Sequence, residues 1–198
     1  LLFSCTSYSQ SARKFVKMGI KKSKIMDYKG ALEDYNKAIE LDPDNIKAYD
    51  KRGNVKSNLL DYKGGIEDYT KVIELDPDNI KAYNERGWAK SRLKDYKGSM
   101  EDFTKVINFK PDEDSYSDRG NAKRNLEDYK GAIEDYTKLI ELEPDEVYFY
   151  FARGYVKELS GDLNGACADW EKAAKSDDIY FVQLSKKYLM MPKCQNYS

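Results

Sequence analysis

The chain has 198 residues, with 34 lysine and arginine residues against 35 aspartate and glutamate residues, and it contains no histidine. A net charge near zero without a basic stripe argues against nucleic acid as a partner, because phosphate binding requires clustered cations. The absence of histidine excludes Ser-His-Asp and Cys-His catalytic arrangements and removes the commonest metal ligand. We therefore expect no enzyme activity, no metal site, no cofactor and no membrane span.

Residues 1–11 precede the first recognisable pattern, and we expect them to be either a signal-peptide remnant or a disordered tail. An apolar stub is followed by small residues, which suits signal cleavage before Gln10. The stretch Leu2–Cys5 also resembles a bacterial lipobox, in which Cys5 would carry a lipid anchor. If this segment is a signal remnant, the protein is exported to the periplasm or the bacterial envelope. If it is not, the cytoplasm is the default location.

From residue 12 onward the sequence repeats itself. Five glycines mark the period at spacings of 34, 34, 33 and 34 residues, and they are Gly19, Gly53, Gly87, Gly120 and Gly154. An Asp-Tyr-Lys-Gly motif recurs with them in the first four units, and a proline closes four units. Such self-similarity predicts a solenoid, in which each unit buries its apolar face against its neighbours. The predicted units are residues 12–45, 46–79, 80–112, 113–146 and 147–180.

Each unit is predicted to be two helices joined by a tight turn. In the second unit the first helix covers residues 46–59, and the glycine inside it, Gly53, costs roughly 1 kcal/mol relative to alanine. Its recurrence indicates close approach of the partner helix, where a Cβ atom would clash. Asp61 is placed to cap the second helix, whose apolar residues have helical spacing and which ends before Pro77.

These recurring positions resemble the tetratricopeptide repeat. The shared set is glycine at the eighth residue of the unit, alanine or glycine at the twentieth, an aromatic residue at the twenty-fourth and proline at the thirty-second. The aromatic residues are Tyr35, Tyr69, Phe103, Tyr136 and Trp170. Pentatricopeptide repeats, the alternative for a helical hairpin of similar period, lack this set. The resemblance covers residues 12–180 and points to a bacterial protein.

The resemblance implies an all-α fold. Its expected form is a right-handed α-α superhelix, a solenoid of five helical hairpins, with a C-terminal capping helix and tail over residues 179–198. One departure from the family pattern is a lysine at every eleventh position and an arginine at most seventh positions. We expect these two ladders to lay their aliphatic stems on neighbouring helices and to keep their charges in water.

Four Glu-Asp pairs recur near the start of the second helices. We interpret them as solvated helix surface, where negative charge suits the helix dipole, and not as catalytic carboxylates. The pairs are Glu33-Asp34, Glu67-Asp68, Glu101-Asp102 and Glu134-Asp135. An enzyme is thus only a third hypothesis, and the divergent stretch Gly161–Trp170 is the one place to seek a site.

The resemblance also implies that the first helices line a concave groove that takes up a peptide or a protein segment. The residues expected to bind this partner are Asn54, Asn58, Lys81, Asn84, Trp88, Arg92, Asn121, Asn125 and Tyr155. Trp88 is the expected anchor, because exposed aromatic residues are enriched among binding hot spots. The alternative is that Trp88 only covers its neighbours. The asparagines are expected to bind peptide backbone, because their amides both donate and accept.

Two hypotheses of function follow. The first is a monomeric, non-catalytic adaptor that binds a protein or peptide in the groove. The second is a structural subunit or anchor of an envelope or enzyme complex, in which the edges of the solenoid make the contacts. A chaperone-tail clamp is disfavoured, because Val16, Ile20 and Asp50 occupy the positions where that clamp has lysine and asparagine.

The cysteines link the fold to the compartment. With Cys5 in the expected signal segment, Cys167 and Cys194 remain as a pair. The stretch Ile179–Met190 is apolar enough for a capping helix that runs back antiparallel and is stopped by Pro192, which would bring Cys194 to Cys167. In an exported protein we expect a disulfide between them, and in a cytoplasmic protein two free thiols.

Overall fold

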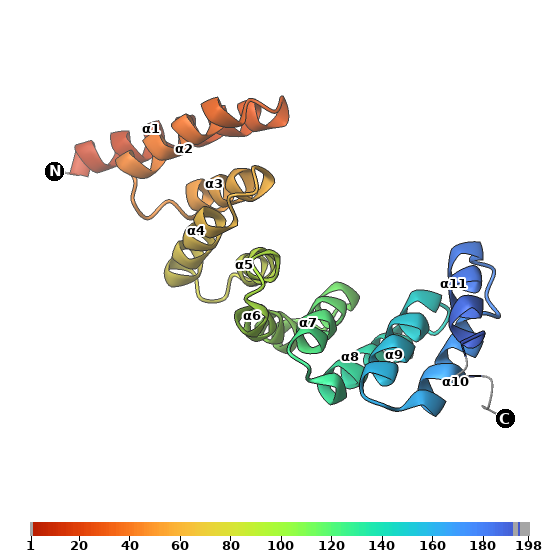
Figure 1. The fold of residues 1–198 in the computed structure, drawn as a ribbon. Helices are drawn as coiled ribbons and strands as arrows, with labels where there is room; N and C mark the ends of the chain where they lie inside the picture. Colours follow the sequence, from red (N-terminus) through yellow and green to blue (C-terminus); the bar gives the residue numbers. More distant parts are fainter. Residues whose placement is uncertain (1, 192–193, 195–198) are drawn as a thin grey trace. The chain divides into compact units, whose positions relative to one another are not determined.

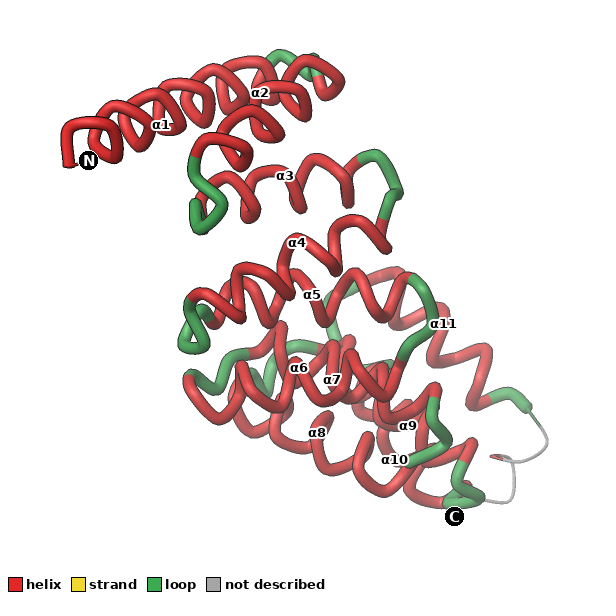
Figure 2. Tube along the Cα trace, turned by 90° about the vertical axis from the view of Figure 1, so that its left-hand side faces the viewer, coloured by secondary structure: helices red, strands yellow, loops and turns green. Residues whose placement is uncertain are grey.

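The computed structural model describes the backbone of residues 2–191 and 194, and the side chains of residues 10–191 and 194. Within these residues the chain forms eleven helices and no strand (Figure 1, Figure 2). The helices belong to two bodies, of which the first ends at Val106 and the second begins at Ile107. The predicted all-α fold is confirmed.

The first body contains the first two repeat units and most of the third. Its helices are α1 (Leu2–Lys24), α2 (Tyr28–Leu41), α3 (Ile46–Asn58), α4 (Tyr62–Leu75), α5 (Ile80–Arg92) and the larger part of α6 (Tyr96–Phe109). Helices α1 and α2 pack together as one hairpin, and α3 and α4 as the next. The second helix of a unit also packs on the first helix of the following unit, as α2 does on α3 and α4 on α5.

The second body repeats this arrangement and adds a cap. Its helices are α7 (Glu113–Asn125), α8 (Tyr129–Leu142), α9 (Val147–Leu159), α10 (Leu163–Ala173) and α11 (Ile179–Leu189). Helices α7 and α8 form one hairpin and α9 and α10 the other, and α8 packs on α9. Helix α11 packs mainly on α10, which leaves it in the position predicted for the capping helix.

Helix α1 is longer than the first helix of every other unit. It begins at Leu2, so residues 2–11 continue the helix where the sequence analysis expected a signal remnant or a disordered tail. The side chains of residues 2–9, including that of Cys5, lie outside the described residues. Helical backbone does not distinguish a signal remnant from a plain extension of α1, and the export signal stays a prediction.

Each hairpin is built around the aromatic residue at the twenty-fourth position of its unit. All five side chains are 1% exposed or less, and they supply the largest apolar area of the core. The recurring glycine faces this ring. A Cβ atom on Gly19 would lie 2.6 Å from Cε1 of Tyr35, and one on Gly154 would lie 2.7 Å from Nε1 of Trp170. The close approach that the glycines predicted is therefore present.

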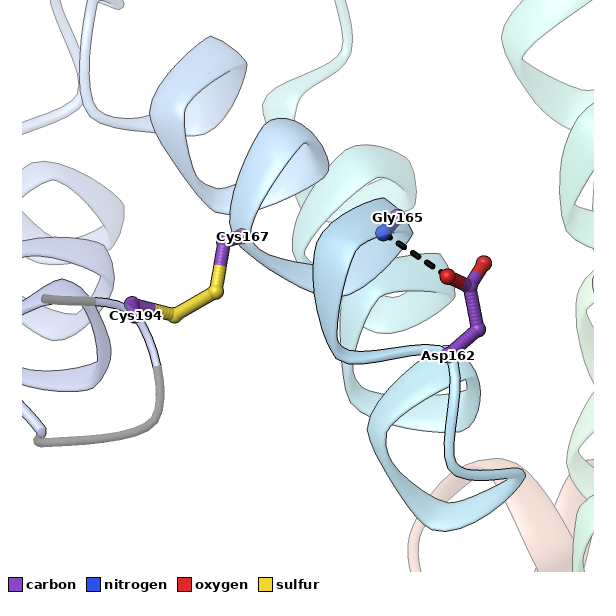
Figure 3. The surroundings of a disulfide bond; sticks show 4 residues. All are labelled: Asp162, Gly165, Cys167 and Cys194. Atoms are coloured by element: carbon purple, nitrogen blue, oxygen red, sulfur yellow. Dashed lines mark hydrogen bonds between the residues drawn. A yellow bond between two sulfur atoms is a disulfide. The ribbon is translucent and has the colours of Figure 1, made fainter. Parts of the chain in front are cut away.

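The turn inside each hairpin has a fixed form. The Asp61 carboxylate accepts a hydrogen bond of 3.0 Å from the backbone N–H of Gly64 and so caps α4 as predicted. Asp162 caps α10 in the same way through Gly165 (Figure 3). The residue before each of these aspartates has a positive φ, which is 65° at Leu60 and 88° at Gly161.

We expect Leu60→Gly to stabilise the first body by about 0.5–1 kcal/mol, because a non-glycine residue is strained in the left-handed region. The Leu60 side chain is exposed, so little packing is lost. Urea unfolding followed by the fluorescence of Trp88 measures the change. The converse variant Gly161→Ala, monitored through Trp170, should destabilise the second body by about 1 kcal/mol. A Leu60→Gly protein that is less stable than the unmodified chain would contradict the prediction that the backbone of Leu60 is strained.

In the part of the chain that the structure describes, no helix has the combination of length and apolar character that a bilayer crossing requires.

Candidate functional site

Four of the predicted binding residues meet in a depression of the first body, between α3 and α5. They are Asn54 and Asn58 on α3 and Asn84 and Trp88 on α5. The full lining is Asn54, Ser57, Asn58, Tyr69, Asn84, Glu85 and Trp88, and the depression has a volume of about 420 Å³. Three asparagine amides and two aromatic residues, Tyr69 and Trp88, thus line the same space, together with Ser57 and Glu85.

Trp88 is 41% exposed, as expected of an anchor, but it is also held by its neighbours. The ring of Tyr62 meets it edge-on at a centroid distance of 5.6 Å. The Cζ atom of Arg92 lies 5.7 Å from the ring centroids of both Trp88 and Tyr62, and Arg92 Nε donates to the Tyr62 hydroxyl at 3.2 Å. These contacts restrict the orientation of the Trp88 ring and leave part of it exposed to a ligand.

Asn54 and Asn121 each have a structural partner that the sequence analysis missed. The Tyr69 hydroxyl donates to Asn54 Oδ1 at 2.9 Å, and the Tyr136 hydroxyl donates to Asn121 Oδ1 at 3.0 Å. A buried tyrosine hydroxyl needs an acceptor, and burial also raises the pKa of both tyrosines. The third unit has Phe103 at the tyrosine position and needs no such acceptor. Each of these two carbonyl oxygens therefore already accepts one hydrogen bond within its hairpin, and the binding of a ligand by the two amide groups stays a prediction.

The remaining residues predicted in the second body lie on α7 and α9. Asn125 Nδ2 donates to the backbone carbonyl of Asn121 at 2.8 Å, so this amide is directed onto its own helix. The ring of Tyr155 lies beside Arg124, whose Cζ atom is 5.9 Å from the ring centroid. The predicted binding residues thus fall into two groups. The second body holds Asn121, Asn125 and Tyr155, and the first body holds the other six.

Lys81 is engaged in an ion pair across α3 and α5. Its Nζ atom lies 2.8 Å from Oδ1 of Asp50, and Lys51 Nζ lies 2.9 Å from Oδ2 of the same carboxylate. Burial opposes ionisation of Asp50, but the hydrogen bonds from Lys81 and Lys51 hold its pKa below the ordinary value. Part of the charge of Lys81 is therefore neutralised within the protein.

The aspartates of the predicted Glu-Asp pairs are buried. Their exposed fractions are 6% for Asp34, 2% for Asp68, 3% for Asp102 and 2% for Asp135, whereas the adjacent glutamates are exposed. The interpretation as solvated surface is therefore wrong for the aspartates. A buried carboxylate must be paired, and the two basic ladders supply the partners.

The third unit shows the arrangement. Arg86 donates to Asp102 through Nε at 3.0 Å and Nη2 at 2.7 Å, and Lys90 Nζ lies 2.8 Å from the same carboxylate. Arg86 Nη1 also donates to Thr70 of the preceding unit at 3.1 Å. The expectation that the ladders keep their charges in water is therefore wrong. The equivalent triads are Arg52-Lys56-Asp68, Arg119-Lys123-Asp135 and Arg153-Lys157-Asp169.

The constant separation of 16 residues between arginine and aspartate was the signal in the sequence that could have revealed these triads. The first unit has Met18 at the arginine position. There Asp34 has Lys22 as its cation, with Nζ 2.8 Å from Oδ2. In the first unit one cation is therefore enough to pair the buried aspartate. In the other units the arginine adds a contact to the preceding unit.

A disulfide joins Cys167 of α10 to Cys194, and their Cα atoms are 5.8 Å apart (Figure 3). This is the pairing that the antiparallel cap predicts. Both side chains are buried. Next to them, the Tyr188 ring of α11 lies 4.7 Å from the Trp170 ring of α10. Pro192, which was expected to stop the capping helix, lies outside the described residues.

The start of α7 carries closely spaced carboxylates. Burial, together with the charges of Asp114 and Asp112, raises the pKa of Asp118 to about 6. Among the described residues, no group of three or more histidine, cysteine, aspartate or glutamate side chains is arranged to hold a metal ion. Burial, first, and the two neighbouring charges, second, thus both favour the protonated form of Asp118.

The raised pKa of Asp118 predicts that the second body becomes more stable as the pH falls through about 6. The folded protein holds the Asp118 proton more tightly than the unfolded chain does, so stability is lost as the pH rises through this value. After allowance for partial solvent exposure, the effect is about 1 kcal/mol. Asp118→Asn should remove this pH dependence and stabilise the second body at pH 7, measured by urea unfolding with Trp170 fluorescence. An unchanged pH profile in the variant would contradict the assignment to Asp118.

Comparison with known families agrees with the repeat pattern. A family model described as "TPR repeat" matches residues 27–59 and 120–161, and two models described as "Tetratricopeptide repeat" match residues 46–79 and 68–100. Together these matches cover more than half of the chain. The protein therefore belongs to the tetratricopeptide repeat family, whose units form a protein-interaction fold.

Solved structures show the same fold at low sequence identity. The crystal structure of MamA has a TM-score of 0.79 at 23% identity, covering 90% of this chain and 96% of that one. MamA from Desulfovibrio magneticus RS-1 has a TM-score of 0.76 at 21% identity, covering 82% and 93%. YrrB, described as a TPR protein with an unusual peptide-binding site, has a TM-score of 0.78 at 19% identity, covering 87% and 90%. No curated protein sequence matches significantly.

Proposed function

We propose that this protein is a non-catalytic scaffold that binds an extended or helical segment of a partner protein on the first helices of its units. The depression lined by Asn54, Asn58, Asn84 and Trp88 is the observation that carries the proposal. The amide nitrogens can donate to a peptide backbone, and the restrained Trp88 ring offers apolar area at little further entropic cost. The peptide-binding site named for YrrB belongs to a protein of the same fold and agrees with this use of the repeats.

Trp88→Ala is expected to weaken binding of the partner segment by about 2 kcal/mol or more, because truncating a hot-spot aromatic residue has this effect. The partner is first identified by pull-down from the native organism and mass spectrometry, and the affinity of its binding segment is measured by isothermal titration. Phe109→Ala, which removes another exposed aromatic residue, is the matched control. Unchanged affinity of the Trp88 variant would remove Trp88 from the site.

A second candidate function is supported by the turn edge of the first body. The apolar residues on these turns are between 41% and 77% exposed, and they are Ile25, Met26, Leu59, Leu60 and Leu93. Such an edge suits a structural subunit or anchor of an envelope or enzyme complex. Serine substitutions at Ile25 and Leu59 separate the two functions, because they would release the partner in the edge mode and leave groove binding intact.

For the location we propose the periplasm or bacterial envelope. The Cys167–Cys194 disulfide supports this, because structural disulfides persist in oxidising compartments. The mass of the native protein tests the proposal. Cleavage before Gln10 or a lipidated Cys5 would support export, and free Cys167 and Cys194 thiols would contradict it.

A further inference from the structure

A second depression of the first body is lined by basic residues. Its volume is about 280 Å³. It is lined by Arg13, Val16 and Lys17 of α1, by Asn45 just before α3 and by Lys47 on α3. Val16 is buried and gives this basic depression an apolar floor, whereas the three cations are exposed. No acidic residue lines it, and no carboxylate among the described side chains forms an ion pair with Arg13, Lys17 or Lys47.

The repeat itself does not require these cations. They occupy the second and sixth residues of the first two units, and the corresponding pairs in the five units are Arg13/Lys17, Lys47/Lys51, Lys81/Glu85, Asp114/Asp118 and Tyr148/Ala152. The same helix positions thus accept positive, negative and uncharged pairs. By contrast, the lysine of the eleventh position pairs with a buried aspartate in every unit and is structural.

The neighbouring basic residues of α3 and α5 are partly neutralised. Lys51 and Lys81 share the Asp50 carboxylate at 2.9 and 2.8 Å. Among the second and sixth residues of the first three units, the cations without an ion pair to a described carboxylate are therefore Arg13, Lys17 and Lys47. Because α1 places Arg13 and Lys17 one turn apart, their side chains are neighbours on one helix face.

We propose that the basic depression binds the acidic part of the partner segment. This rests on the proposed function and adds the charge of the bound segment. Carboxylates of the ligand would accept hydrogen bonds from the three cations, while the apolar stem of a glutamate, or an apolar neighbour, packs on Val16. A nucleic-acid backbone fits less well, because it requires a longer basic track than three side chains in one depression.

Selection from a random peptide library displayed on phage tests the charge of the ligand. The full chain, the triple variant Arg13→Glu/Lys17→Glu/Lys47→Glu and the control Lys29→Glu/Lys63→Glu/Lys97→Glu are each panned against the same library. The control makes the same change in net charge at exposed lysines on α2, α4 and α6. We expect acidic peptides to be enriched by the unmodified chain and by the control, and to be lost with the triple variant. Circular dichroism verifies the fold of each protein.

One enriched acidic peptide is then synthesised and titrated. We expect the triple variant to bind it at least about tenfold more weakly, and added salt to weaken binding to the unmodified chain, because exposed charge pairs are screened. Enrichment of neutral or basic peptides, or equal binding of the acidic peptide to both proteins, would overturn the proposal. Peptides that depend on Trp88 but not on the three cations overturn only this inference. Failure to enrich any peptide, or peptides indifferent to Trp88→Ala, counts against the groove function itself.

Discussion

Asp68→Ala is expected to destabilise the first body by about 3–5 kcal/mol, the usual cost of removing one member of a buried ion cluster. Asp68 is 2% exposed and accepts from Arg52 at 2.6 Å and from Lys56 at 2.9 Å. The variant leaves two cations whose side chains are largely covered and which have lost their carboxylate. The contact of Arg52 with Asn36 of the preceding unit, 2.7 Å long, also loses its support.

Urea unfolding monitored through Trp88 measures this effect in the first body, and Trp170 reports the second body separately. Glu67→Ala is the matched control, since Glu67 is the adjacent exposed carboxylate and its loss should change the free energy of unfolding by less than about 0.5 kcal/mol. Equal stabilities of the two variants would show that the buried triads do not hold the units together. Because a solenoid is stabilised by its neighbour contacts, the loss should be largest in the first body.

Much of the fold could be predicted because the residues that determine each helix contact and each helix cap recur in several repeat units. The positions of Gly53 and Asp61 are ambiguous in one unit, but their recurrence indicates the helix contact and the cap that the structure contains. The predicted helix at residues 46–59 differs from α3 by one residue at its end. Local turn chemistry and helical periodicity determine these features, and both are readable from sequence.

The buried aspartates were missed for a physical reason. General tendencies place aspartate on the surface, and the partner of Asp102 is Arg86, which comes from the other helix of the hairpin. Only the packing of the two helices shows that the two side chains meet. The recurrence of both residues in four units carried this information, but their charge made solvent the simpler interpretation.

In the candidate site, too, some features could be predicted from the sequence and others could not. The exposure of Trp88 follows from its position in the unit and was predicted. The role of Asn54 depends on the reach of the Tyr69 hydroxyl across the hairpin, which a helical pattern does not show. The contacts of Arg92 with two rings likewise arise where α4 and α5 pack.

Reduction of the Cys167–Cys194 disulfide is expected to destabilise the C-terminal cap by about 3–4 kcal/mol. The bond closes a loop with a sequence separation of 27 residues, and opening it returns the corresponding chain entropy to the unfolded state. The loss should concentrate in α11, which lies at the end of the second body and packs on α10 and α9 among the described helices. Once α11 separates, Trp170 loses the Tyr188 ring that lies 4.7 Å away.

The measurement compares urea unfolding of the oxidised and reduced protein through Trp170 fluorescence, with Trp88 replaced by phenylalanine to remove the signal of the first body. Cys194→Ser should reproduce the reduced protein, and Cys5→Ser, outside this loop, should behave like the oxidised one. Hydrogen exchange should accelerate in α11 and stay unchanged in α3 and α4, because each unit depends on its neighbours. If reduction leaves both the unfolding curve and α11 exchange unaltered, the packing of Phe181 and Tyr188 on the aromatic residues of α9 and α10 is enough to hold the cap. The disulfide then contributes nothing to its stability.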